Sequence, residues 1–206
     1  MEPLDTRTYD PLDYENLAAS CVQELMRRGP YQLPIGARFD GAGVYALFYR
    51  GDFEPYRPIS SSDATVPIYV GSAVSAGTRK GIIEAPDDFV AIGPVLFRRL
   101  QHHVRALTAT PNLRIDDFLC RFIVVRPLWT EMVERFLITH YRPIWNLVLD
   151  GFGNHDPGAG RHQGEVPWWD AMHPGARKWA ARLRQTRGEA DARERLRAHL
   201  TSRENR

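Results

Sequence analysis

The chain of 206 residues is long enough for one domain with an appended arm. Hydrophobic residues make up 43% and charged residues 25%, which is ordinary for a globular protein. No apolar run approaches the ~20 residues that span a bilayer, and the polar start MEPLDTRTYD does not have the pattern of a signal peptide. Cys21 and Cys120 form neither a disulfide framework nor a zinc pattern, so we expect a cytoplasmic protein that makes no use of a membrane.

The charged residues are distributed unevenly along the chain. The net charge of +2 does not by itself indicate a nucleic-acid binder. Residues 1–24 contain six acidic side chains and one basic side chain, whereas residues 177–206 contain ten Lys or Arg and four Asp or Glu. Arginine accounts for 25 of the 27 basic residues, and its guanidinium binds phosphate and guanine edges in bidentate fashion. A GC-rich genome would produce the same bias, so both explanations stay open.

The pattern of apolar, glycine and proline residues predicts five segments in the first half of the chain. Leu17, Cys21 and Leu25 have helical spacing, and the run GVYALFY is typical of a buried strand. In chain order we expect a helix at 10–28, a strand at 43–49, a loop at 51–67, a second strand antiparallel to the first at 68–71, and an irregular connection at 75–88.

The second half is expected to contain more helix than strand. Pro94 suits the first position of a helix, Thr130 is a candidate cap for the next helix, and Pro143 would end that helix. In chain order we expect a helix at 94–107, a strand at 118–125, a helix at 130–142, a glycine-rich loop at 150–167, and charged helices at 175–185 and 189–200. The expected fold class is therefore α+β, with a small, mostly antiparallel sheet flanked by helices. We expect an N-terminal helical arm (1–40), a core (41–149) and a basic helical extension (150–206) within one compact domain.

Two tyrosines lie beside glycine on the two expected strands, in the runs GVY and YVG. Tyrosine alone favours a half-buried strand, but glycine in a strand often marks a close backbone approach. A phenol has an ordinary pKa of ~10, so Tyr45 needs a nearby cation or base to take part in proton transfer near neutral pH. Tyr69 would then support it as a hydrogen-bond donor.

The helix expected at 94–107 contains two equivalent pairs of basic side chains. Arg99 and His103 are four residues apart and share a helix face, and Arg98 and His102 have the same spacing. A guanidinium can bind a scissile phosphate, and an imidazole can accept or donate the proton. The spacing alone does not choose between the two pairs.

A carboxylate and an amide follow these pairs. Glu134 lies beside apolar residues of the helix expected at 130–142, where an unpaired charge is costly. It is either exposed, paired with Arg135 or Arg98, or a ligand of one Mg²⁺, a hard ion that binds few carboxylates and keeps its waters. Asn146, after Trp145, is either a turn residue or a group that orients a site.

In this order, the residues resemble the GIY-YIG nuclease family. The resemblance covers about residues 41–146, and valine replaces isoleucine in both motifs. It assigns the site to six residues, Tyr45, Tyr69, Arg99, His103, Glu134 and Asn146. It favours Arg99 over Arg98, because the family's motif arginine is followed by leucine, as in the run RLQHH. The two tyrosines are 24 positions apart, a longer spacing than in compact family members. The run DGFGNHDPGAGR resembles the type II restriction endonuclease branch that cuts a GC-rich palindrome.

This resemblance implies a bacterial restriction enzyme that cuts double-stranded DNA as a homodimer. One Mg²⁺ per active site would be held by Glu134, Arg99 would neutralise the phosphate, and either Tyr45 or His103 would take the proton from water. The implied target is a six-base sequence such as CCGCGG, and a companion DNA methyltransferase would protect the host. The expected DNA-contacting residues are Arg79, Lys80, Asn154, His155 and Arg161.

Other interpretations remain. A structure-selective repair or recombination nuclease could share the fold, although such chains usually carry extra domains for which this one has little room. A non-catalytic DNA-binding protein is a second alternative, and the reactive residue types at every motif position argue against it. His155, His162 and His173 do not match zinc-ligand spacing. The basic C-terminal helices could contact DNA, mediate dimerisation or only keep the chain soluble.

Overall fold

A computed structural model describes residues 13–74 and 93–204 of the chain. Within these residues, four antiparallel strands form one sheet in the order β1-β4-β2-β3. The strands are β1 (Tyr31–Gln32), β2 (Gly43–Tyr49), β3 (Tyr69–Ala73) and β4 (Phe118–Val124). The catalytic tyrosine candidates therefore lie on neighbouring strands, with β3 at an edge.

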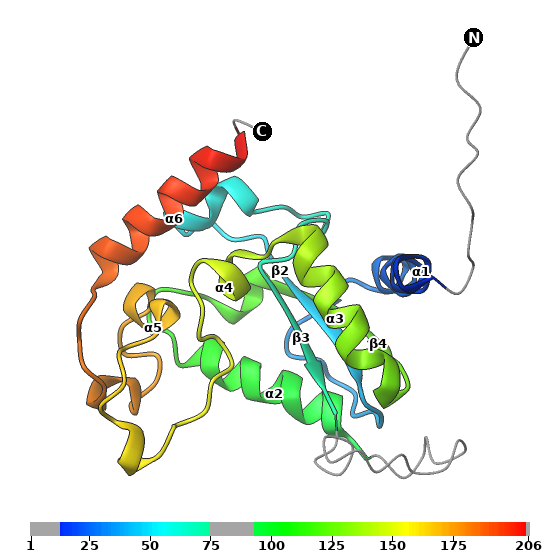
Figure 1. The fold of residues 1–206 in the computed structure, drawn as a ribbon, viewed down its shortest axis with the longest axis horizontal. Helices are drawn as coiled ribbons and strands as arrows, with labels where there is room; N and C mark the ends of the chain where they lie inside the picture. The colour runs from blue at the N-terminus through cyan, green and yellow to red at the C-terminus, as the bar shows by residue number, and fades with distance from the viewer. Residues whose placement is uncertain (1–12, 75–92, 205–206) are drawn as a thin grey trace.

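Six α-helices occur among the described residues, and Figure 1 shows them arranged around the sheet. They are α1 (Tyr14–Arg27), α2 (Val95–Thr108), α3 (Pro127–Tyr141), α4 (Ile144–Leu147), α5 (Trp168–Met172) and α6 (Glu189–Glu204). Short 3₁₀ helices are η1 (Glu54–Ile59), η4 (Ile115–Asp117), η5 (Ala159–Arg161) and η6 (Ala180–Arg182). The α+β class expected from the sequence is confirmed.

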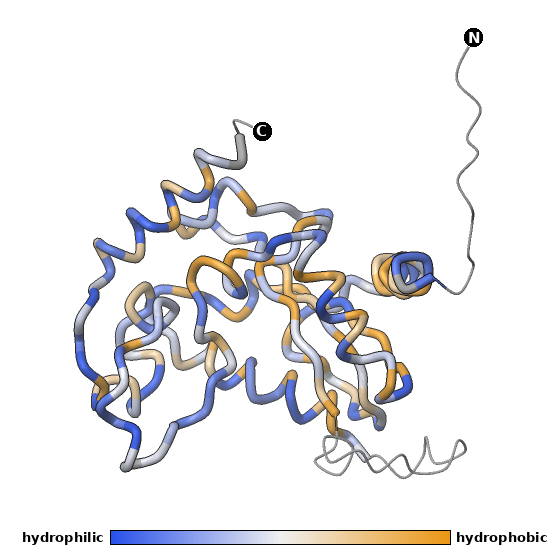
Figure 2. The backbone as a smooth tube through the Cα atoms, viewed as in Figure 1, coloured by the Kyte–Doolittle hydropathy of each residue, from blue (hydrophilic) through white to orange (hydrophobic). Residues whose placement is uncertain are grey.

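The central strand β2 is buried on both faces, which explains its unbroken apolar run. Tyr45, Leu47 and Tyr49 face one core that also includes residues of α2, α4, α5 and α6. Val44, Ala46 and Phe48 face a second core formed with α1 and α3. The tube in Figure 2 is apolar around the central strands and mostly polar along α6. The sheet thus separates a helical layer of α1 and α3 from a layer that holds α2 and the C-terminal extension.

The C-terminal extension packs on the nuclease-like core. Leu196 of α6 and Trp169 of α5 belong to the same buried cluster as Tyr45. Arg193 of α6 forms an ion pair with Glu54 of η1 at 2.9 Å. The extension therefore covers the sheet face from which Tyr45 projects.

Three expectations about local structure are wrong. Thr130 does not cap α3, because the helix begins at Pro127 and the Thr130 hydroxyl donates to the Pro127 carbonyl at 2.9 Å within the helix. Pro94 is the N-cap of α2 and not its first helical residue. Residues 51–67 are not all loop, since they contain η1.

Residues 175–185 do not form the expected helix, and only η6 is helical there. The segment begins at Gly175 with a φ of +84°, and the Arg177 side chain turns inward to bond distant groups. Tertiary contacts of this kind override a weak helix propensity. The sequence also did not predict β1, α4 or α5, each of which is five residues or shorter.

Candidate active site

The centre of the site is a buried pair formed by Tyr45 and His103. Tyr45 Oη lies 2.5 Å from His103 Nε2, and neither side chain is exposed to solvent. Burial, followed by the nearby positive charge of Arg99, lowers the pKa of His103 well below its ordinary value. Burial, followed by the neighbouring Tyr69, raises the pKa of Tyr45 well above its ordinary value. Both groups are therefore neutral near neutral pH, and the phenol donates to the imidazole.

Tyr69 and Gly71 complete the tyrosine side of the site. Gly71 is the Cα partner of Tyr45 in the antiparallel register of β2 and β3. The rings of Tyr69 and His103 meet edge to face, with centroids 5.5 Å apart. Burial raises the pKa of Tyr69, and the charge of Arg99 opposes that shift. Both phenols thus lie within the field of one guanidinium.

The structure distinguishes between the two basic pairs on α2. Arg99 is half-buried, and its charge acts on the phenols of Tyr45 and Tyr69. In the same pair as Arg99, His103 is fully buried. Arg98, of the other pair, is exposed. One helical turn separates Arg99 from His103, and α2 presents both to the Tyr45 face of the sheet. The pair implied by the family resemblance is the pair that the fold brings to Tyr45.

Glu134 reaches the edge strand from α3 and is held by a residue that sequence reasoning did not identify. Ser72 Oγ donates to Glu134 Oε2 at 2.6 Å. Burial raises the pKa of Glu134, and the Ser72 hydrogen bond and the Arg99 charge oppose the shift. Ser72 directly follows the second motif glycine, and this adjacency is the only sequence signal that could have identified it.

The donor set fits a hydrated divalent ion. Within residues 13–74 and 93–204, no group of three or more His, Cys, Asp or Glu side chains could hold a metal. A zinc centre requires such a group, whereas Mg²⁺ is commonly bound by one or two carboxylates and keeps several waters. Glu134, oriented by Ser72, suits the second kind of ion.

The side chain of Asn146 forms hydrogen bonds with the backbone of the edge strand β3. Its Nδ2 donates to the Val70 carbonyl at 2.8 Å, and its Oδ1 accepts from the Val70 amide at 2.9 Å. The amide group on α4 therefore pairs with β3 as a further strand would. Val70 lies between Tyr69 and Gly71, so Asn146 holds the segment that carries the second motif.

A loop of the extension, residues 151–154, forms one wall of the site and is called the wall loop below. Arg99 Nη1 donates to the carbonyl oxygen of Gly153 at 3.1 Å. The Phe152 ring stacks on His103, with centroids 4.6 Å apart and an interplanar angle of 21°. The sequence showed only a glycine-rich loop here, because the partners of Phe152 and Gly153 lie about fifty residues away.

The expected DNA-contacting residues lie in different places. Arg79 and Lys80 are outside the described residues. His155 follows the wall loop, with its Nε2 3.5 Å from Arg99 Nη1 and its ring centroid 4.5 Å from that of His102. Asn154 is exposed in the wall loop, and Arg161 is exposed in η5. Their contact with DNA stays a prediction.

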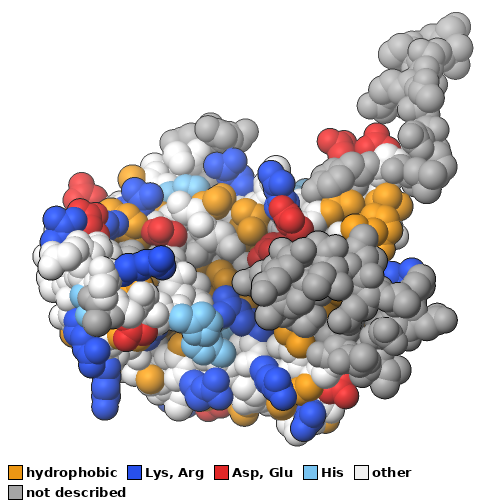
Figure 3. Space-filling view, turned by 60° about the horizontal axis from the view of Figure 1, so that its bottom comes forward, with side chains coloured by type: hydrophobic (Ala, Val, Ile, Leu, Met, Phe, Trp, Pro, Cys, Tyr) orange, Lys and Arg blue, Asp and Glu red, His pale blue; other side chains and the backbone are white. Residues whose placement is uncertain are grey.

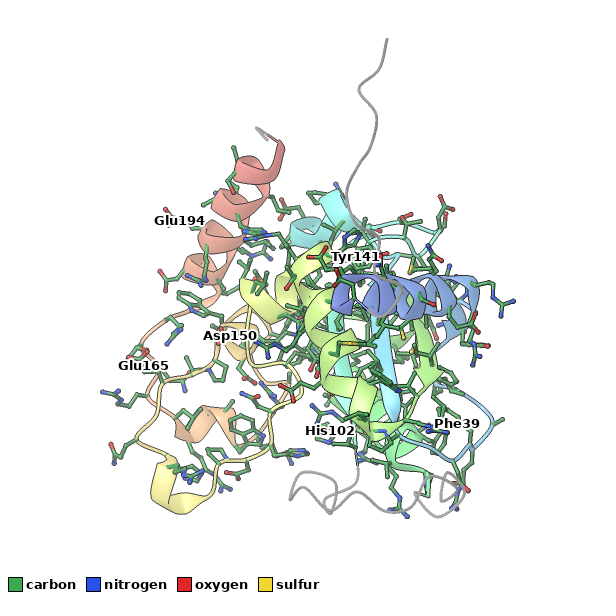
Figure 4. All side chains as sticks on the ribbon, turned by 45° about the vertical axis from the view of Figure 1, so that its right-hand side comes forward. Phe39, His102, Tyr141, Asp150, Glu165 and Glu194 are labelled. Atoms are coloured by element: carbon green, nitrogen blue, oxygen red, sulfur yellow. The ribbon has the colours of Figure 1, made fainter. Side chains whose placement is uncertain are left out.

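The surface beside Arg99 is rich in imidazole and guanidinium groups. Figure 3 shows histidine side chains gathered next to basic side chains on this face. Figure 4 labels His102 on α2, toward the loop that follows Asp150. Burial, followed by the proximity of His155, lowers the pKa of His102 to about 4. His102 is therefore neutral near neutral pH.

Comparisons with known proteins identify a family. A protein-family model described as the Eco29kI GIY-YIG domain matches residues 37–200. The match includes every site residue discussed above and most of the C-terminal extension. No curated protein matches the chain. None of the helices in the described ranges has the length and apolar character needed to cross a membrane.

Proposed function

Because the chain belongs to the GIY-YIG family of nucleases, with a domain of the Eco29kI type, we propose that it is a type II restriction endonuclease that cuts double-stranded DNA at a specific sequence. The observation that carries the proposal is the 2.5 Å contact between Tyr45 and His103, buried beside Arg99. A phenol and a neutral imidazole in hydrogen-bond contact form a proton-transfer pair, and an adjacent guanidinium provides a phosphate site.

In the proposed reaction, Tyr45 takes a proton from the attacking water while its own proton passes to His103 Nε2. The transfer needs a neutral imidazole, and the lowered pKa of His103 keeps it neutral before substrate binds. Arg99 binds the scissile phosphate and stabilises the charge that develops on it. The bound phosphate offsets the Arg99 charge, which otherwise opposes protonation of His103. Substrate binding would thereby favour the proton transfer.

The remaining site residues support these steps. Tyr69 donates a hydrogen bond to the phosphate or to the attacking water. Glu134, with its carboxylate oriented by Ser72, would hold one Mg²⁺. An ion bound there would supply positive charge to the phosphate and to the leaving 3′ oxygen. Asn146 keeps β3 in place through its two hydrogen bonds to Val70.

We further propose a homodimer with one active site for each strand, because a palindromic target and a two-fold dimer share the same symmetry. The proposed target is GC-rich, for example CCGCGG. Asn154, His155 and Arg161, together with Arg79 and Lys80, are the proposed DNA contacts. A companion methyltransferase would modify the same sequence in the host.

The test is cleavage of mixed-sequence plasmid and phage DNA by the purified protein with Mg²⁺ or with EDTA, followed by sequencing of the ends. We expect discrete Mg²⁺-dependent fragments that share one terminal sequence. Tyr45→Phe should lower the cleavage rate by about 10²–10⁴-fold. Both Tyr45→Phe and Glu134→Ala should still bind DNA in a gel-shift assay.

Three results would count against the proposal. Preferential cutting of branched DNA over plain duplex would indicate the structure-selective alternative. Unchanged cleavage by Glu134→Ala would show that the acidic residue has no part in the reaction, and nicking of one strand by a stable monomer would contradict the dimer.

A further inference from the structure

The wall loop contacts the catalytic candidates through two consecutive residues. The Gly153 carbonyl accepts the hydrogen bond from Arg99, and the Phe152 ring lies against His103. Phe152 also meets the Tyr69 ring edge to face, with centroids 4.9 Å apart. Three catalytic side chains therefore depend for their position on a loop of the C-terminal extension.

Gly153 leaves no room between the loop and the site. Its φ is +79°, a conformation that strains any residue with a side chain. A Cβ at this position would lie 2.9 Å from Arg99 Nη2, 2.9 Å from His103 Cε1 and 3.3 Å from Tyr69 Oη. A small displacement of the loop would thus be transmitted directly to these side chains.

Arg177 holds the opposite side of the wall loop. Its Nη1 donates to the carbonyl oxygens of Gly151 at 3.0 Å and Asn154 at 3.1 Å. These two carbonyls flank Phe152 and Gly153 in the chain. One guanidinium therefore bridges the two ends of the loop.

The guanidinium itself is held by an ion pair with Asp170 of α5. Arg177 Nε donates to Asp170 Oδ1 at 2.7 Å, and Nη2 donates to Oδ2. The two side chains are only 8% and 3% exposed. Rings of Trp169 and Trp179 lie over the guanidinium carbon at 4.9 and 4.7 Å. Removing one member of such a buried pair leaves an uncompensated charge, so Arg177 and Asp170 depend on each other for their positions.

We propose that Arg177, fixed by Asp170, is a positioning residue for DNA cleavage, which it serves by holding the wall loop against Arg99 and His103. The proposal rests on the nuclease function proposed above. Displacement of a reacting group by about 1 Å can cost about 10²-fold in rate. The wall loop has two glycines with positive φ and belongs to no helix or strand, so its own backbone supplies little resistance to such a displacement.

Arg177→Lys is the principal variant, because lysine keeps the charge but cannot reach both carbonyls and both carboxylate oxygens from one ammonium group. We expect kcat on duplex DNA to fall by at least about tenfold, with KM and gel-shift affinity nearly unchanged. Asp170→Asn is the second variant, for use if Arg177→Lys does not fold, and it should shift kcat in the same direction.

Arg121→Lys is the matched control. Arg121 is likewise an arginine in the interior, and it donates to the backbone carbonyls of Met26 and Arg28 on the other face of the sheet. We expect it to lose stability on urea denaturation while kcat of the folded enzyme stays unchanged. If Arg177→Lys behaves in the same way as Arg121→Lys, Arg177 is only a structural residue and the proposal is overturned.

A measurement without DNA separates this proposal from the nuclease function. The imidazole of His103 is followed by NMR from about pH 8 to pH 5 in the wild type and in Arg177→Lys. We expect no titration in the wild type and a shift of the midpoint into this range in the variant, because a displaced Phe152 admits water to the ring. A shift in a protein that cuts no DNA would show that Arg177 positions the surroundings of His103 and would refute only the nuclease function. An unchanged His103 signal in an active enzyme would refute the positioning role alone.

Discussion

Gly71 faces the phenol oxygen of Tyr45 across the pairing of β2 and β3. The two residues are Cα partners, and a Cβ at position 71 would lie 2.4 Å from Tyr45 Oη and 2.7 Å from its Cζ. The same Cβ would lie 3.0 Å from Cε1 of Tyr69. The glycine of the second motif therefore makes room for the tyrosine of the first, which ties the two motifs into one site.

Gly71→Ala should displace the Tyr45 phenol from His103 and abolish most of the cleavage activity. The new methyl group meets two buried aromatic rings that have no free space, and overpacking of this kind costs about 1–3 kcal/mol of stability. Cleavage rate and urea denaturation measure the two effects. Gly36→Ala is the control, since a Cβ there meets nothing within 4 Å, and it should change neither quantity. An active Gly71→Ala protein would show that the phenol needs no fixed position.

Ser72→Ala should make the ionised form of Glu134 less stable. Loss of the 2.6 Å hydrogen bond removes the largest effect that opposes the raised pKa of Glu134, so that pKa rises further. The reaction needs the ionised carboxylate, which exists above the pKa of Glu134. As the pH is lowered, Ser72→Ala should therefore lose activity at a higher pH than the wild type does. Removal of such supporting groups typically costs about 10–100-fold in metal affinity.

The measurement is the Mg²⁺ concentration for half-maximal cleavage at two pH values. The exposed Ser62 provides the control variant, Ser62→Ala, which should match the wild type. An Mg²⁺ requirement that does not differ between Ser72→Ala and the wild type would remove Glu134 from the proposed metal site.

The sequence predicted which elements carry the candidate site residues where local geometry alone determines this. Residues 43–49 form β2 as expected, because an unbroken apolar run with flanking glycine suits a strand buried on both faces. Arg99 and His103 share a face of α2 because four residues make about one helical turn. Spacing could not choose between this pair and its neighbour, since that choice depends on how α2 is rotated against the sheet.

What the sequence could not predict depends on contacts between distant segments. Ser72 and Glu134 are 62 residues apart, and Arg99 and Gly153 are 54 apart. The expected helix at 175–185 does not form, and Arg177 of that segment bonds Asp170 and the wall loop. Neither periodicity nor residue type carries information about such partners.

Asn146→Ala should lose stability and activity together. Both hydrogen bonds of the amide go to the backbone of Val70, and leaving these groups unpaired costs about 1–3 kcal/mol. Displacement of β3 would then misplace Tyr69 and Gly71. Urea denaturation and cleavage rate test the two parts, with Asn154→Ala as an exposed control for stability. Full stability with lost activity would instead mean that Asn146 acts directly on the metal or the substrate.

A second buried tyrosine–histidine pair should make the protein sensitive to acid. Tyr56 Oη donates a hydrogen bond to His173 Nε2 at a distance of 2.6 Å. His173 Nδ1 donates to Asn112 Oδ1 at a distance of 2.7 Å. Burial, followed by the charges of Arg177 and Arg193, lowers the pKa of His173 to about 3. The neutral ring joins η1, the segment after α2, and the C-terminal extension.

The sign of the pH effect follows from this lowered pKa. An unfolded histidine has a pKa of about 6.5, so between about pH 6.5 and pH 3 the unfolded state binds a proton that the folded state does not. The stabilisation from His173 is complete above pH 6.5 and declines by about 1.4 kcal/mol per pH unit below it.

His173→Gln cannot titrate, so its stability should be lower at about pH 8 but should fall less steeply toward pH 4.5. Urea denaturation across this range measures both slopes. Equal slopes in His173→Gln and the wild type would mean that acid unfolding begins elsewhere, with the buried His103 as the next group to test.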